Sequence, residues 1–239
     1  MTKSKLLILG NSHSEALPRD PIDGYDLEIH WLKTKDNAKF GTMTLPEARE
    51  KVASLTANDT LVLMHLGALH NIYGLLNHDV PYGVLLDDGA RVGPEDAQII
   101  PVSSIRAVFQ NKFESDKVVP AIKEATRAQV VHVMPPPPKE EIPERFRNKG
   151  GDYHGRGIAE FGFAPADLRL ALWRIEESAL SSFLGKLGIM HYAAPAETLT
   201  ATGFLAPDFY ANDATHANAA FGKQLMDAIV RLSKSRAYI

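Results

Sequence analysis

The stretch that decides the fold reads Lys5-Leu6-Leu7-Ile8-Leu9-Gly10-Asn11-Ser12. Its apolar run is not interrupted by polar residues, which is typical of a strand buried on both faces of a parallel sheet. Gly10, Asn11 and Ser12 follow at once, and residues of these types indicate a sharp turn. We therefore expect a first parallel strand whose carboxyl end presents Ser12.

Four more short apolar runs follow, at 27–31, 61–65, 130–134 and 188–192, and the segments between them are long enough for crossover helices. Helical spacing of apolar residues predicts helices over 45–55, 105–125, 168–187 and 217–232, with Pro120 breaking or beginning a helix. The alternation predicts a doubly wound α/β sheet. Ligands bind such sheets beyond the carboxyl ends of the strands, where Ser12, Gly67 and the prolines at 135–138 fall.

Length and composition indicate a single domain over residues 1–239, because a chain with 45% hydrophobic residues can bury a full core. The segments 66–101 and 139–165 do not fit the alternation of strands and helices. Ordered segments of this length are typical of lids or binding loops, and a solvated excursion is the alternative.

Charge and composition argue against several classes of partner. A formal net charge of -3 offers no basic face to nucleic acid and no polybasic segment to an acidic membrane surface, so we expect neither partner. The absence of cysteine removes disulfides, thiolate nucleophiles and thiolate metal sites. The apolar segment before Gly10 is too short for a signal-peptide core or a membrane span, so we expect a cytoplasmic protein.

Ser12 is a candidate nucleophile, because a tight turn after a buried strand exposes a hydroxyl at the catalytic edge of the sheet. The alternative is that Ser12 only caps a helix. Near the other end of the chain, Asp213 and His216 form a DxxH motif before an amphipathic helix. A carboxylate at this spacing can hold the imidazole, and the alternative is an N-cap followed by a first-turn residue.

Together the two motifs resemble the SGNH/GDSL hydrolase superfamily. Gly10-Asn11-Ser12 stands at the family's GDS turn, and Asp213 to His216 stands at its DxxH. The run Gly-Asn-Ser-His-Ser looks most like the GDSH variant of domains associated with polysaccharide O-acyl transfer and deacylation. The resemblance implies a flavodoxin-like three-layer α/β/α sandwich, a five-stranded parallel sheet in the order 2-1-3-4-5, and a catalytic triad. Asn11 replaces the usual aspartate and can still make the hydrogen bonds of the turn.

The resemblance also implies an oxyanion hole, built from the Ser12 backbone N–H, a glycine after the second strand and an asparagine side chain after the third. Gly41 is suitably placed for the glycine. In the third block the sequence departs from the family pattern Gly-x-Asn, because Leu69 stands at the position of the asparagine. The candidates for the missing donor and for substrate binding are Gly67, His70, Asn71 and His13.

We therefore expect a serine esterase that cleaves an acyl ester, such as an O-acetyl ester, of a carbohydrate or small metabolite through an acyl-enzyme. The alternatives are an O-acyltransferase acting on a sugar and a catalytically inactive binding protein of the same fold. A nucleotide binder with 10–14 as its phosphate loop is less favoured, since GxGxxG and a Walker lysine are missing.

Neither a metal nor another cofactor is expected, because the remaining histidines show no HxH or HExxH spacing. These histidines include His65, His132, His154 and His191. The basic stretch 145–149 could attract an anionic substrate, with a solvated loop as the alternative.

Overall fold

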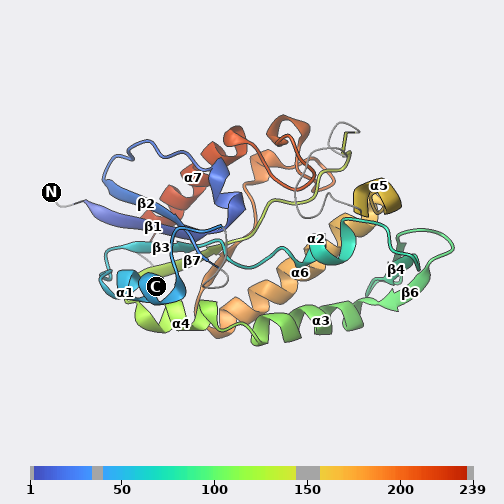
Figure 1. The fold of residues 1–239 in the computed structure, drawn as a ribbon, viewed down its shortest axis with the longest axis horizontal. Helices are drawn as coiled ribbons and strands as arrows, with labels where there is room; N and C mark the ends of the chain where they lie inside the picture. Colours follow the sequence, from blue (N-terminus) through green and yellow to red (C-terminus); the bar gives the residue numbers. More distant parts are fainter. Residues whose placement is uncertain (1–2, 34–39, 144–156, 236–239) are drawn as a thin grey trace.

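The computed structural model describes residues 3–33, 40–143 and 157–235. Its main sheet has five parallel strands in the order β2-β1-β3-β7-β8 (Figure 1). The bounds are Ser4–Gly10 for β1, Tyr25–Trp31 for β2, Thr60–Leu63 for β3, Gln129–Val133 for β7 and Met190–Tyr192 for β8. All five expected strands are present, and numbered among themselves they have the expected order 2-1-3-4-5, which confirms the flavodoxin-like fold.

Side chains of β1 alternate between two cores. Leu7 and Leu9 pack into a core shared with α1 (Leu45–Ala53), α4 (Val118–Ala125) and α6 (Ala166–Lys186). Leu6 and Ile8 point the other way, into the core beneath α7 (Ala219–Lys234). Figure 1 shows α7 on the opposite side of the sheet from α1 and α4. Burial on both faces explains why the strand is apolar from Leu6 to Leu9.

The helix expected over 105–125 is two helices, α3 (Val102–Glu114) and α4. Pro120 lies in the first turn of α4, where its missing N–H leaves no hydrogen bond unmade. Asp116 supports this start, since its Oδ2 accepts a hydrogen bond from Val119 N at 2.8 Å. The last helix begins slightly later than expected because Asn218 caps it, with Oδ1 accepting from the N–H of Ala220.

Segment 66–101 has secondary structure of its own. It contains α2 (Leu69–Gly74) and a small sheet of three strands, β4 (Tyr82–Leu85), β5 (Arg91–Val92) and β6 (Gln98–Pro101). Its role as a lid or binding loop stays a prediction. Within 139–165, residues 144–156 lie outside the described residues, and with them the basic stretch 145–149 and His154; α5 (Gly157–Phe161) follows.

Short 3-10 helices complete the chain, at η1 (Ser12–Ala16), η3 (Ala196–Thr198) and η4 (Pro207–Phe209). In the part of the chain that the structure describes, none of the helices has the length and apolar character needed to cross a bilayer.

The close packing of α7 against η1 positions the first turn of the chain. Gly222 of α7 faces the backbone of Ala16, and a Cβ added to Gly222 would lie only 1.7 Å from the Ala16 carbonyl oxygen. Only a glycine permits this approach, because a methyl group would overlap a backbone atom that cannot rotate away. The position of η1, and so of Ser12, therefore depends on Gly222.

We predict opposite effects for two helical glycines. Glycine to alanine inside a helix normally stabilises a protein by about 0.5–1 kcal/mol. Gly185→Ala on α6 should follow this rule, since nothing lies near its added Cβ. Gly222→Ala should instead lower the free energy of unfolding by about 1–3 kcal/mol through overpacking. Urea unfolding of both variants checks this, and stabilisation by Gly222→Ala would contradict the close contact.

Candidate active site

Ser12 is the first residue of η1, directly after β1. Asn11 caps η1, because its Oδ1 accepts a hydrogen bond from His13 N at 3.0 Å. Ser14 Oγ donates to the Asn11 carbonyl at 2.7 Å, and Gly10 leaves room for this side chain, since a Cβ there would lie 2.9 Å from Ser14 Cβ. The capping role suggested as an alternative for Ser12 thus belongs to Asn11, and the Ser12 hydroxyl is left for other contacts.

Asp213 holds the loop that carries His216. Its Oδ1 accepts hydrogen bonds from the backbone N–H of Thr215 at 2.8 Å and of His216 at 2.7 Å. The Ala211 N–H donates to the His216 carbonyl at 3.1 Å and closes the loop. Since Asn218 caps α7, the alternative in which Asp213 is the N-cap of this helix is wrong.

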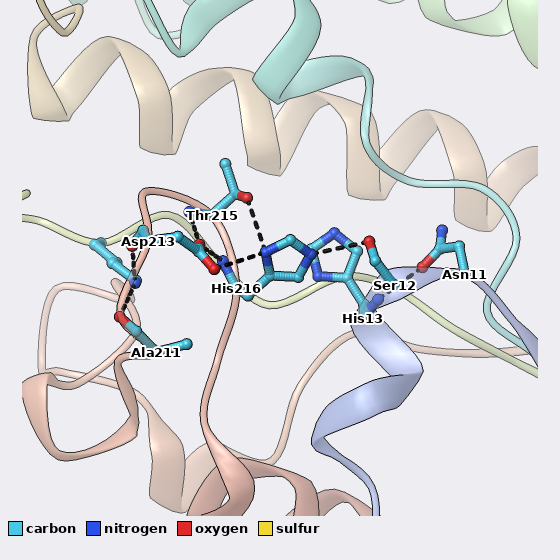
Figure 2. A network of polar contacts seen from close by, with 8 residues as sticks. Asn11, Ser12, His13, Ala211, Asp213, Thr215 and His216 are labelled. Atoms are coloured by element: carbon cyan, nitrogen blue, oxygen red, sulfur yellow. Dashed lines mark hydrogen bonds and ion pairs between the residues drawn. The ribbon is translucent and has the colours of Figure 1, made fainter. Parts of the chain in front are cut away.

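The side chains of Ser12, His216 and Asp213 form one chain of hydrogen bonds (Figure 2). Asp213 Oδ2 lies 3.0 Å from His216 Nδ1, and His216 Nε2 lies 2.9 Å from Ser12 Oγ. Because a carboxylate only accepts hydrogen bonds, Nδ1 carries the ring hydrogen and Nε2 is free to accept from the Ser12 hydroxyl. The structure thus brings together the three residues that the sequence suggested from opposite ends of the chain.

The Asp213 carboxylate is ionised at neutral pH. Its partial burial raises the pKa, but the hydrogen bonds from the His216 ring, the His216 N–H and the Thr215 N–H outweigh this and hold the pKa well below its usual range. A fixed negative charge beside Nδ1 stabilises the imidazolium that forms when His216 takes a proton.

His13 lies against His216. Its ring centroid is 4.5 Å from that of His216, and its Nδ1 is buried without a hydrogen-bond partner among the described residues. Burial, followed by the nearby His216 and His70, lowers the His13 pKa to about 3. His13 is therefore neutral at physiological pH, and its ring shields one side of His216 from water without adding a competing charge.

The other expected site residues lie at the carboxyl ends of neighbouring strands. Gly41 follows β2, and the adjoining Thr42 N–H donates to Trp31 O at 2.9 Å. Gly67 lies between β3 and α2, and Asn71 lies within α2. Among the described residues, none of these three makes a hydrogen bond to Ser12, so their roles in the site stay predictions.

His70 occupies a more specific environment than the sequence suggested. It is 2% exposed, and its Nδ1 lies 2.7 Å from Oε2 of Glu176, a residue of α6 that is 0% exposed. The same carboxylate accepts the backbone N–H of Leu69 at 2.9 Å and of His70 at 2.8 Å. His70 Nε2 is buried and has no hydrogen-bond partner in the described chain. His70 is also among the groups that lower the pKa of His13.

Three further histidines contact residues other than Ser12, Asp213 and His216. His132 and His191 are paired across β7 and β8, with their Nδ1 atoms 3.3 Å apart. His65 Nε2 lies 3.7 Å from Asp116 Oδ1. Among residues 3–33, 40–143 and 157–235 there is no group of three or more side chains suited to hold a metal ion.

Comparison with solved structures identifies proteins that share this fold. An extracellular lipase from Streptomyces rimosus aligns with a TM-score of 0.50 and 13% identity, covering 96% of this chain and 99% of the lipase chain. This chain has the fold of that lipase. The α/β architecture expected from the resemblance to SGNH hydrolases is thereby confirmed, while at this identity the chemistry has to be argued from the side chains.

Two further structures align at slightly lower scores. A carbohydrate acetylesterase from Sinorhizobium meliloti gives a TM-score of 0.48 at 13% identity and covers 98% of this chain and 99% of its own. The periplasmic domain of a lipopolysaccharide acetyltransferase from Salmonella ser. Paratyphi A gives 0.49 at 14% identity, with coverage of 97% and 84%. Neither a family model nor a curated protein matches the chain.

Asp213→Asn tests the hydrogen-bond chain directly. The variant keeps an oxygen for the two backbone N–H groups but can turn its amide N–H₂ toward Nδ1, so the ring hydrogen moves to Nε2 and Ser12 loses its acceptor. We expect ¹⁵N NMR of the His216 ring to show this change of tautomer. The free energy of unfolding at pH 7 should fall by about 1–3 kcal/mol.

Asp213→Asn should also change how the free energy of unfolding depends on pH. A carboxylate whose pKa is lowered by folding contributes stability above its unfolded pKa and loses it as the pH falls through the folded value. The difference in the free energy of unfolding between wild type and Asp213→Asn should therefore narrow as the pH falls below about 4. Urea denaturation at several pH values from 7 to 3 measures this difference. Asp208→Asn, which changes an exposed aspartate, is the control. A difference that stays constant across this range would show that Asp213 is not held ionised by its partners.

Proposed function

We propose that this protein is a serine esterase of the SGNH/GDSL type, with Ser12 as nucleophile, His216 as general base and acid, and Asp213 as the residue that orients the imidazole. One observation carries the proposal: the continuous hydrogen-bond chain from Asp213 Oδ2 through the His216 ring to Ser12 Oγ. A serine is a weak nucleophile without such a base, so this arrangement is what acyl transfer requires.

In the proposed reaction Ser12 Oγ attacks the ester carbonyl carbon, and its proton moves to His216 Nε2. When the tetrahedral intermediate collapses, His216 returns this proton to the departing alkoxide oxygen, which leaves as the alcohol. The acyl group stays on Ser12 until a water molecule attacks the acyl carbon, with His216 again taking a proton. The carboxylic acid then leaves, and Ser12 regains its hydrogen.

The oxyanion formed in each step needs hydrogen-bond donors beside Ser12. We assign the backbone N–H of Ser12 and of Gly41 to this role, as the resemblance implies, and His70 as the side-chain donor in place of asparagine. His70 Nε2 is the buried atom without a partner, and Glu176 fixes the ring through Nδ1. An Nε2 that carries a hydrogen would donate to the oxyanion.

The substrate class in this proposal is an acyl ester, such as an O-acetyl ester, of a carbohydrate or small metabolite. A cytoplasmic location and the absence of nucleic-acid and membrane partners stay predictions.

Ser12→Ala should lower kcat/KM for p-nitrophenyl acetate by roughly 10³-fold or more, because the proposed acyl-enzyme forms on Ser12 Oγ. A fluorophosphonate probe should label the wild type once, on a peptide that contains Ser12, as read by mass spectrometry. Ser104→Ala, which changes an exposed serine on α3, serves as the control that keeps activity and labelling. Turnover that survives Ser12→Ala, or a folded wild type with neither turnover nor labelling, would favour the binding-protein alternative.

His70→Leu should lower kcat roughly 100-fold with little change in KM, because a donor to the oxyanion acts in the transition state rather than on bound ester. His70→Asn restores an N–H donor and should recover part of the loss. His78→Leu, on an exposed histidine of the same segment, is the matched control. A correctly folded His70→Leu protein with wild-type kcat would remove His70 from the oxyanion site.

A further inference from the structure

Lys139 is a buried lysine at the edge of the candidate active site. It follows the prolines at 135–138 and is 1% exposed. Its Nζ donates hydrogen bonds to the carbonyl oxygens of Ala211, at 2.8 Å, and of Asp213. Nζ also lies 5.0 Å from the centre of the Tyr210 ring. The ammonium therefore binds the inner side of the loop that carries the candidate acid Asp213.

The loop needs a donor at this point. Ala211 and Asp213 turn their carbonyl groups inward, while the Ala211 N–H closes the loop onto the His216 carbonyl. Buried carbonyl groups require hydrogen bonds. Lys139 supplies them on one side of Asp213, and the N–H groups of Thr215 and His216 bind its carboxylate on the other.

A second buried cation fixes Lys139 itself. Arg169 of α6 is 5% exposed and donates to the carbonyl oxygens of Lys139, of Glu140 at 2.8 Å and of Ala164 at 3.0 Å. The backbone at Lys139 is thus attached to α6, and its side chain reaches from there to the Asp213 loop. This gives a path of consecutive hydrogen bonds from α6 to the residue that orients His216.

The charge of Lys139 by itself costs stability. Burial lowers the Lys139 pKa to about 8, although the Asp213 carboxylate raises it in part. Since the pKa of an unfolded lysine is about 10.4, the charged form is penalised in the folded protein, and the penalty is complete below pH 8. An uncharged apolar side chain would avoid this penalty, but it would leave the carbonyl groups of Ala211 and Asp213 without the donor that Lys139 supplies.

We propose that Lys139 is a positioning residue for the catalytic triad, holding the Asp213 loop so that the carboxylate faces His216 Nδ1. This inference rests on the proposed function for its kinetic consequence but not for its structural one. The positive charge also favours the ionised form of Asp213, since opposite charges within a buried site stabilise one another.

Lys139→Met and Lys139→Gln separate this role from a structural one. Methionine keeps most of the volume without any donor, whereas glutamine keeps an uncharged N–H₂ group on a slightly shorter side chain. We expect kcat for p-nitrophenyl acetate to fall about 10- to 100-fold in Lys139→Met, with KM changed less than about twofold, because misplacing a catalytic group by a fraction of an ångström has effects of this size. Lys139→Gln should lie between this variant and the wild type.

The pH dependence of stability separates the charge of Lys139 from its hydrogen bonds. At pH 7 the free energy of unfolding of Lys139→Met should be lower than that of the wild type, because two buried carbonyl groups lose their donor. The deficit should grow as the pH rises from 8 to 10.5, because the wild type is relieved of its buried charge in this range. The other charged and titratable groups around Lys139 are Asp213, Tyr210, Glu140 and Arg169, and both variants retain them. Lys223→Met, on an exposed lysine of α7, is the control for removing a lysine charge.

A readout without substrate keeps the two proposals distinguishable. The His216 Nδ1 hydrogen shared with Asp213 should give a low-field ¹H NMR signal in the resting protein, assigned by its loss in Asp213→Asn. In Lys139→Met this signal should broaden or disappear. A sharp signal and wild-type kcat would overturn the role of Lys139, and so would variants that both fail to fold. A wild type without Ser12-dependent turnover but with a signal sensitive to Lys139 would contradict the esterase proposal alone.

Discussion

The contact of Gly222 with the Ala16 carbonyl joins the last helix of the chain to its first turn, and the candidate site depends on it. Ser12 and His216 are 204 residues apart in sequence, yet their side chains are within 2.9 Å. Two constraints bring them together: β1 ends at the edge of the sheet, and α7 packs on η1 closely enough that the loop before α7 lies over that edge. A shift of either element would separate Ser12 Oγ from His216 Nε2, since a hydrogen bond tolerates only a few tenths of an ångström.

The ionisable groups beside His216 are held in different protonation states by their surroundings. Asp213 is ionised because three N–H groups bind its carboxylate, and His13 is neutral because burial removes its ring from water. His216 therefore lies between a fixed negative charge and an uncharged ring. A proton accepted from Ser12 is stabilised from the Asp213 side, and the surrounding groups need not reorganise when the charge appears.

The strands and the turn that presents Ser12 are predictable from local pattern, because short apolar runs, the first of them followed by Gly-Asn-Ser, are informative within a few residues. The order of the strands is predicted by the resemblance to a known family and not by the runs themselves. Lys139, Arg169 and Glu176 were not found, because a single charged residue in a helical or loop pattern looks the same whether it faces solvent or the core. Their burial is set by the packing of distant segments.

The small sheet was missed for a different reason. Its strands β4, β5 and β6 have four, two and four residues, too few for alternation to be recognised. One local signal was available, since Asp88-Gly89 stands between β4 and β5, and such pairs favour the tight turn of a hairpin.

The segment after β3 is held in place by α6. The residue before α2 is Ala68, whose side chain cannot cap the helix, and Glu176 instead accepts the free N–H groups of Leu69 and His70. One buried carboxylate thus caps α2 and orients the His70 ring. Arg169, two turns earlier on α6, fixes the backbone of Lys139. The same helix is therefore attached to the segment after β3 and to the segment that holds the Asp213 loop, so a shift of α6 would alter two sides of the site together.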